Sequence, residues 1–154
     1  MRISFDLDDT LVCYQPGVPQ EPRLPWYLRW LAVNEPLRLG TVNLIRELRD
    51  RGWEVWIYTT SHRRESAVRR WLRLHGARID GFVNQGVHES HLRRSPEDRP
   101  PSKNPAVFHI DLHVDDSEGV KMEGEEYGFQ VVVVTPEDEQ WVDRVLCAAR
   151  ELES

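Results

Sequence analysis

Residues 2–11 read Arg-Ile-Ser-Phe-Asp-Leu-Asp-Asp-Thr-Leu, and this stretch decides the fold. Every second residue from Ile3 to Leu7 is apolar, which is the two-residue period of a β-strand. The stretch ends in carboxylates, and Asp6 and Asp8 are two positions apart, so an extended chain points them the same way. We expect the first strand of a sheet here, with an acidic site at its carboxyl end.

Segments with helical and strand-like periodicity alternate along the rest of the chain. Apolar residues three or four positions apart follow Thr41, which predicts an amphipathic helix that ends at Gly52. The expected helices cover residues 41–51, 61–75 and 136–149, with caps at Ser61 and Thr135, and a helix broken by glycine is expected between residues 114 and 131. The expected strands cover residues 53–58, 81–84, 106–114 and 131–134. This alternation predicts an α/β fold: a Rossmann-like doubly wound parallel sheet sandwiched by helices, with ligands bound beyond the carboxyl ends of the strands.

Two segments lack this periodicity. Residues 14–38 contain five of the ten prolines, which disfavours a long helix or a central strand, and we expect an ordered flap there. A short helix is expected after Pro25. Residues 86–104 are polar and contain several prolines, which predicts a surface loop. The length of 154 residues suits one domain, residues 1–154, with the flap as a lid-like insertion.

Composition excludes several classes of function. The chain has 20 basic and 26 acidic residues, and the net charge of −6 disfavours binding to nucleic acid through its backbone alone. No apolar run approaches the length that spans a bilayer, and carboxylates near the start argue against a secretory signal, so we expect a cytoplasmic protein. Cys13 and Cys147 show no CxxC spacing and are expected to be free thiols.

Further polar residues follow the other expected strands. Asp115 and Asp116 end the fourth strand, and Thr59-Thr60-Ser61 ends the second. The carboxyl ends of neighbouring parallel strands lie together, so these groups are expected to meet the acids of residues 6–8. Carboxylate oxygens suit Mg²⁺, hydroxyls and helix amides bind phosphate oxygens, and Lys103 can neutralise the remaining charge. The sequence therefore predicts a site for Mg²⁺ and a phosphate group.

In these positions the chain resembles the haloacid dehalogenase superfamily of phosphohydrolases along essentially its whole length. The pentad Asp6-Leu7-Asp8-Asp9-Thr10 fits the first motif of that superfamily, Asp-x-Asp-x-Thr, without departure. The second motif, a Thr or Ser after an apolar strand, fits Thr59 best, with Thr60 as the alternative. The third motif, a Lys, fits Lys103, and the fourth, an acidic pair, fits residues 115–116.

The resemblance implies a role for each residue. Asp6 would attack phosphorus to form an aspartyl-phosphate, and Asp8 would protonate the leaving oxygen and then activate water. Thr59 and Lys103 would hold the phosphate. Mg²⁺ would be held by Asp6, by the backbone carbonyl of Asp8 and by Asp115. Asp116 would be a further ligand through water, or a brace for Lys103.

The resemblance also narrows the reaction. Dehalogenases of the superfamily lack a carboxylate at the position of Asp8, so a phosphatase is favoured. The interval between Asp6 and Thr59 is too short for a full helical cap, which resembles the capless subclass. The expected function is Mg²⁺-dependent hydrolysis of phosphate monoesters, on a phosphorylated small molecule or a larger phosphoester, with only the flap as a built-in lid.

Two other functions stay open. One is a non-catalytic phosphate-binding or phosphoacceptor module akin to receiver domains, although these carry their phosphorylated Asp after the third strand, where this chain has Asn84. The other is a phosphatase that processes nucleic-acid ends. Two interpretations of a group of basic residues stay open: they bind an anionic ligand, or they form ion pairs with acids of the flap. The residues are His62, Arg63, Arg64, Arg93, Arg94 and Arg99.

Two further patterns carry competing interpretations. Trp26, Tyr27 and Trp30 are expected to fill a core, with stacking on a base or sugar as the alternative. Polar residues also recur at two-residue steps along the predicted fourth strand, at His109, Asp111, His113 and Asp115. There a hydrogen-bonded polar core is favoured over a transition-metal site.

Overall fold

The computed structural model describes residues 1–31, 33, 35–92 and 101–154, and it contains one parallel sheet with the strand order β3-β2-β1-β4-β5. The strands are β1 (Arg2–Phe5), β2 (Glu54–Tyr58), β3 (Gly81–Val83), β4 (Leu112–Asp115) and β5 (Gln130–Val133). The α-helices are α1 (Thr41–Asp50), α2 (Glu65–His75), α3 (Gln85–Leu92), α4 (Glu118–Tyr127) and α5 (Trp141–Glu153). The doubly wound α/β fold is confirmed.

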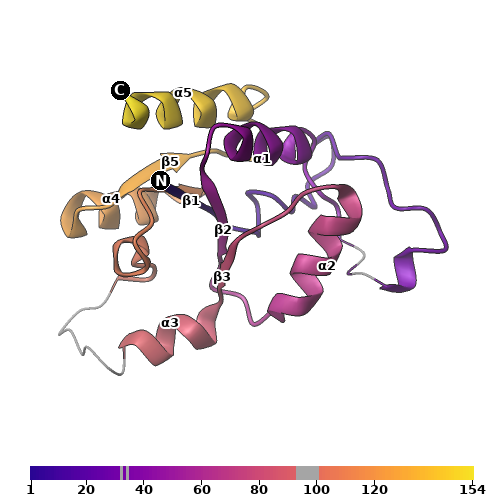
Figure 1. Cartoon of the computed structure of the whole chain (residues 1–154), viewed down its shortest axis with the longest axis horizontal. Helices are drawn as coiled ribbons and strands as arrows, with labels where there is room; N and C mark the ends of the chain where they lie inside the picture. The colour runs from indigo at the N-terminus through magenta and orange to yellow at the C-terminus, as the bar shows by residue number, and fades with distance from the viewer. Residues whose placement is uncertain (32, 34, 93–100) are drawn as a thin grey trace.

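Helices cover both faces of the sheet. Helices α1 and α5 lie side by side along one face, and α4 covers β5 from the other (Figure 1). The predicted periodicity of α1 is confirmed, because Leu44, Ile45 and Leu48 are buried against the sheet. In the described residues, no helix is long and apolar enough to span a membrane.

Strand β1 lies at the centre, paired on one side with β2 and on the other with β4. Its register places Ser4 opposite His113, and the backbone N–H of Asp6 donates to the carbonyl of Val114 at 2.9 Å. The chain segments that leave β1, β2 and β4 therefore emerge next to one another at the carboxyl edge of the sheet.

Helix α2 begins at Glu65, so the predicted cap at Ser61 is wrong. The backbone carbonyl of Ser61 accepts a hydrogen bond from Gln85 N at 3.3 Å, and that of Arg63 accepts one from the Asn84 side chain at 3.2 Å. Because these carbonyls bind the β3–α3 connection, they are not available to amides of a helix. The basic residues 62–64 thus precede the helix, and its first turn contains an acid, as the helix dipole favours.

The segment before β4 is helical where a strand was predicted. Residues Pro105–Phe108 form a 3₁₀ helix, η2, because proline suits the first turn of a helix. His109 then takes a left-handed conformation with φ 55°, and β4 begins only at Leu112. The two-residue alternation expected from residue 106 onward therefore begins only at residue 112.

Residues 86–104 are not only a loop. Helix α3 occupies residues 85–92, and the Asn84 side chain caps it by accepting from Val87 N at 3.1 Å. Arg93, Arg94 and Arg99 lie outside the described residues. The last helix also differs from expectation: α5 starts at Trp141, since residues 136–140 form a turn whose carbonyls bind Arg38.

The described part of residues 14–38 is an irregular flap, as predicted. It contains one 3₁₀ turn, η1 (Arg29–Leu31), and short bridges that join Val12 to Leu37 and Gln20 to Arg38. The expectation that its aromatic residues fill a core is wrong. Trp26, Tyr27 and Trp30 are 79%, 55% and 80% exposed.

Gly124 in α4 supports a specific stability prediction. A Cβ atom there would lie 2.6 Å from the backbone oxygen of Phe129, which a side-chain shift cannot relieve. We expect Gly124→Ala to lower the free energy of unfolding by about 1–3 kcal/mol in urea denaturation, although alanine is the better helix former. The control is Gly86→Ala in α3, where the nearest atom is 3.5 Å away and a gain of about 0.5–1 kcal/mol is expected. A Gly124→Ala protein as stable as the control would contradict the close contact.

Candidate functional site

Asp6 lies at the centre of the carboxyl edge, directly after β1, and is only 7% exposed. Burial raises the pKa of its carboxyl group, and the nearby charge of Asp115 adds to this, while Lys103 opposes it. The Oδ1 atom is buried and accepts no well-aligned hydrogen bond from the described residues. A buried carboxylate with acceptor capacity beyond its ion pair with Lys103 can bind a cation or an incoming group.

Lys103 supplies the positive charge of the site. Its Nζ atom lies 3.0 Å from Asp6 Oδ1 and donates to Asp115 Oδ2 at 2.5 Å, and the residue is 3% exposed. Burial alone would lower the pKa of Lys103, but the charges of Asp6 and Asp115 outweigh it and raise the pKa. The next residue is anchored as well, since Asn104 N donates to the Tyr58 hydroxyl at 2.8 Å. The site therefore contains the ammonium group of Lys103 in a fixed position.

Asp115 is bound from several sides. Besides Lys103, its Oδ2 accepts from His113 Nε2 at 3.0 Å, and its Oδ1 accepts from Ser117 N at 3.0 Å. Burial would raise the pKa of Asp115, but the hydrogen bond from His113 and the charge of Lys103 hold it well below its ordinary range. Asp115 is therefore an ionised group with both oxygens occupied.

A chain of hydrogen bonds through Ser4 and His113 holds Asp115 in place. Complete burial lowers the pKa of His113, so the ring is neutral. With Nε2–H donating to Asp115, Nδ1 accepts from the Ser4 hydroxyl at 2.7 Å. The polar-core interpretation of His113 fits this contact, whereas His109 and Asp111 do not join it: Asp111 binds Arg2 N at 2.7 Å. The role of Ser4 was not predicted, and its only signal was a polar position inside an apolar strand.

Among the described residues, Asp6, Asp115 and Asp116 offer carboxylate oxygens within 4.8 Å of one another. Burial and the neighbouring charge of Asp115 raise the pKa of Asp116. Three carboxylates against one ammonium group leave an excess of two negative charges when all are ionised. This set of hard oxygen donors and its charge fit a divalent cation such as Mg²⁺.

The Asp8 side chain has different surroundings from that of Asp6. Because β1 ends at Phe5 and Asp9 takes a φ of 56°, the strand alternation does not continue. The Asp8 side chain is half exposed, and both its oxygens accept from Arg63, at 2.7 Å and 2.8 Å. Arg63 also donates from Nε to Glu35 of the flap at 3.0 Å. One arginine thus links Asp8 to the flap.

Thr59, which fits the second motif, directly follows β2 at the same edge of the sheet. Thr59 is 1% exposed, and its Oγ1 accepts from Ser61 N at 3.2 Å, which fixes the turn after β2. Thr60 is exposed. Thr10, the last residue of the acidic pentad, is also buried, and its hydroxyl finds no partner among the described residues.

Arg38 braces the loops around the site and was not identified from the sequence. It is 2% exposed and donates to four backbone carbonyls: those of Thr10, Thr135, Pro136 and Asp138. Its guanidinium group also lies 4.7 Å from the ring centroid of Trp141. Arg38 thereby holds the loop after β1 against the turn before α5.

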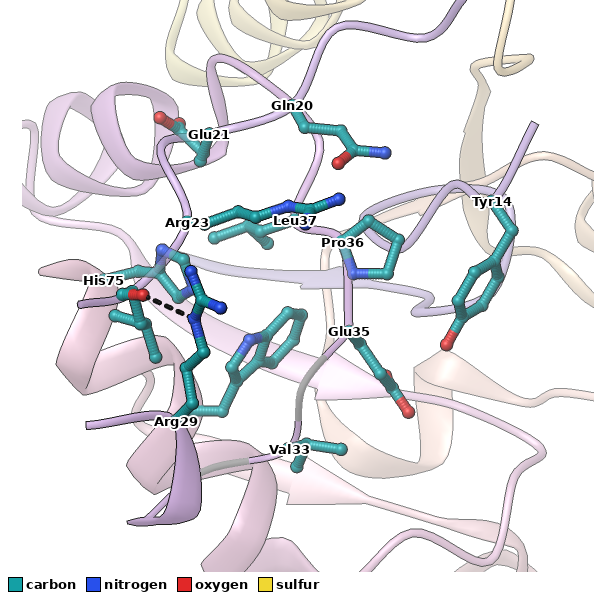
Figure 2. A pocket seen from close by; sticks show the side chains of 12 residues that line it. Tyr14, Gln20, Glu21, Arg23, Arg29, Val33, Glu35, Pro36, Leu37 and His75 are labelled. Carbon is teal, nitrogen blue, oxygen red and sulfur yellow. Dashed lines mark hydrogen bonds between the residues drawn. The ribbon is translucent and has the colours of Figure 1, made fainter. Parts of the chain in front are cut away.

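A cavity of about 270 Å³ separates the flap from α2 (Figure 2). Tyr14, Glu35 and Arg29 line it from the flap, and Trp71 and His75 line it from α2. Glu35 is both a wall of this cavity and a partner of Arg63. Glu35 therefore connects the cavity to the arginine that holds Asp8.

No protein-family model and no curated protein matches the chain. Among solved structures, a chain of the Pnkp1/Rnl/Hen1 complex matches with a TM-score of 0.53 and 14% identity; the match covers 86% of this chain and 45% of that one, so this chain spans about half its length. A predicted HAD-like family hydrolase from Porphyromonas gingivalis gives 0.49 and 12%, over 99% and 98%. The D,D-heptose 1,7-bisphosphate phosphatase from B. bronchiseptica, with magnesium and phosphate, gives 0.49 and 13%, over 97% and 98%.

At these identities, structural likeness concerns the fold and not the activity. The chain has a doubly wound α/β fold, and the chain of the Pnkp1/Rnl/Hen1 complex matches it over 86% of this chain. In this fold the four motif segments of the chain, at residues 6–10, 59, 103 and 115–116, emerge at one edge of the sheet.

The neutral His113 predicts a pH dependence of stability. Its pKa is lowered in the folded chain, so it stabilises the fold above the ordinary histidine value of 6.5 and loses that contribution as the pH falls below it. We expect the free energy of unfolding to fall from about pH 7.5 to about pH 5, and to fall less in His113→Gln, as measured by urea denaturation at each pH. The control His62→Gln changes an exposed histidine and should keep the wild-type slope. An unchanged slope in His113→Gln would show that this ring does not govern the pH response.

Proposed function

We propose that the chain is a Mg²⁺-dependent phosphatase that hydrolyses phosphate monoesters through an aspartyl-phosphate on Asp6. The observation that carries the proposal is the buried Asp6 carboxylate, which follows the central strand and lies 3.0 Å from Lys103. Two further acids, Asp115 and Asp116, are grouped with it. A carboxylate nucleophile needs a nearby positive charge to receive an anionic phosphate, and Lys103 provides one that is fixed by its own ion pairs.

In the first half of the reaction, an Asp6 oxygen attacks phosphorus and the bond between phosphorus and the ester oxygen breaks. Asp8, which takes up a proton from solvent as one of its oxygens leaves Arg63, gives this proton to the leaving oxygen. In the second half, water attacks the aspartyl-phosphate, Asp8 takes its proton, and the bond between phosphorus and Asp6 breaks to release phosphate. Lys103 and the Thr59 turn hold the phosphate oxygens throughout.

The metal ligands follow from the acceptor capacity of each carboxylate. Both oxygens of Asp115 accept hydrogen bonds from protein donors, whereas Asp6 Oδ1 has an ion pair with Lys103 at 3.0 Å and no aligned hydrogen bond from the described residues. We therefore assign Asp6 and Asp116 as direct carboxylate ligands, with the backbone carbonyl of Asp8 as a third ligand, and Asp115 as the brace of Lys103. Bound Mg²⁺ would supply the positive charge that offsets the acids and the phosphate.

Asp6→Asn tests the nucleophile. We expect hydrolysis of p-nitrophenyl phosphate with Mg²⁺ to fall by about a thousandfold or more, because an amide cannot form the covalent intermediate. EDTA should abolish the wild-type activity, and added Mg²⁺ should restore it. Released phosphate is the measurement.

Asp9→Asn is the matched control, since it makes the same change three residues along and asparagine tolerates the positive φ of this position. It should keep activity within a few-fold of wild type. Full activity in Asp6→Asn would exclude the mechanism. A wild-type protein that takes up phosphate on Asp6 and never releases it would instead be the phosphoacceptor module.

Arg63 is a positioning residue for Asp8. We expect Arg63→Ala to lower kcat for p-nitrophenyl phosphate by about ten- to a hundredfold with a smaller change in KM, because the proton donor is no longer held. Added guanidinium ion should restore part of the loss, which a merely misfolded variant would not show. The neighbouring Arg64→Ala is the control and should leave this reaction unchanged. Equal losses in both variants, without rescue, would contradict the role.

A further inference from the structure

Positive charge is concentrated in two segments of this acidic chain. The net charge is −6, yet residues 22–31 and 62–78 together hold eight arginines and one acid. The second segment contains α2, and the first is the outer part of the flap. A local basic surface attracts anions in spite of the net charge, because salt screens charges more than about 8 Å away at physiological ionic strength.

The arginines of α2 line its outer face. Arg69, Arg70 and Arg73 surround a shallow depression of about 380 Å³, and Arg78 completes it from the following loop. Arg69 is engaged with Glu65. Within the described ranges, no carboxylate pairs with Arg70, Arg73 or Arg78, and all three are exposed. The depression therefore has uncompensated positive charge.

Exposed aromatic rings lie on the flap beside this helix. Trp26 and Trp30 are about four-fifths exposed, and Trp26 meets Tyr27 edge to face at 5.9 Å. Arg70 donates to the carbonyl of Leu31 in η1 at 3.4 Å, so the aromatic turn contacts the arginine helix (Figure 1). Large apolar rings in water are costly unless a partner covers them.

The combined surface leads to the proposed catalytic site. Arg63, which precedes α2, binds Asp8, and Glu35 at the end of the flap binds the same arginine. Helix α2 has 11 residues and is therefore about 16 Å long, a span that several nucleotides can follow. The amino end of α2 follows Arg63 at the carboxyl edge of the sheet, and the depression formed with Arg73 and Arg78 lies toward its other end, before β3.

We propose that this surface binds the end of a single-stranded polynucleotide and presents its terminal phosphate to Asp6. The α2 arginines would contact backbone phosphates, and Trp26 and Trp30 would stack on bases. This inference rests on the proposed function, since it names the substrate class of the same site. A single-stranded polynucleotide is favoured over a compact polyanion, because only the polynucleotide has bases that can stack on the exposed rings of Trp26 and Trp30.

Binding is tested with two labelled eight-nucleotide strands that end in a phosphate, one with bases and one abasic, in EDTA to prevent turnover. Fluorescence anisotropy should show the strand with bases binding at least tenfold more tightly. Trp26→Ala/Trp30→Ala should remove this difference and leave abasic binding unchanged. Equal affinity for the two strands in the wild type would overturn the proposal.

The charge contribution is tested with Arg70→Ala/Arg73→Ala/Arg78→Ala. Both strands should bind more weakly, and the slope of log affinity against log salt should become shallower by about 2, since each lost phosphate contact removes about 0.7. The control removes three exposed arginines elsewhere, Arg46, Arg144 and Arg150, and should keep the wild-type slope. Equal losses in both triple variants would overturn the proposal.

Turnover separates this proposal from the proposed function. The surface variants should hydrolyse p-nitrophenyl phosphate within twofold of wild type, while their kcat/KM for the phosphorylated strand falls at least tenfold. A wild type that hydrolyses p-nitrophenyl phosphate but neither binds nor dephosphorylates the strand would overturn the polynucleotide proposal alone. Full p-nitrophenyl phosphate activity in Asp6→Asn would overturn the catalytic proposal, whatever the strand affinities.

Discussion

The burial of one ammonium group among carboxylates is the interaction on which the rest of the site depends. Lys103 is nearly inaccessible to solvent, and its charge is balanced only because Asp6 and Asp115 reach it from two neighbouring strands. Removing one partner of such a buried pair typically costs about 3–5 kcal/mol, since the other charge is left without compensation. The segment before η2, the end of β1 and the end of β4 must therefore keep their positions relative to one another. The hydrogen bonds from His113 and Ser117 to Asp115 serve the same balance.

Much of this arrangement could be predicted from local patterns. Apolar periodicity identified the strands, and the rule that parallel strands place ligands beyond their carboxyl ends indicated that the segments of Asp6, Thr59 and Asp115 would meet. Lys103 has no periodic signal, and it was identified by its positive charge ahead of the fourth strand and then by its fit to the third motif. In the structure, Lys103 Nζ lies 3.0 Å from Asp6 Oδ1 and donates to Asp115 Oδ2 at 2.5 Å.

Other features depend on contacts between distant segments, and no local pattern contains them. The start of α2 is set by hydrogen bonds to the β3–α3 connection, and the pairing of Ser4 with His113 is set by strand register. The exposure of the flap tryptophans also contradicted their usual place in a core. Sequence composition gives the total charge, whereas the basic face of α2 exists only once the helix has turned its apolar side, with Val68 and Leu72, toward the sheet.

The single guanidinium group shared by Asp8 and Glu35 makes the flap and the acid thermodynamically linked. Any molecule that enters the neighbouring cavity and competes for Glu35 changes the free energy with which Arg63 holds Asp8. By reciprocity, a molecule that engages Asp8 changes the affinity of the cavity for its occupant by the same factor. One side chain thereby connects the space beneath the flap to the carboxylate of Asp8.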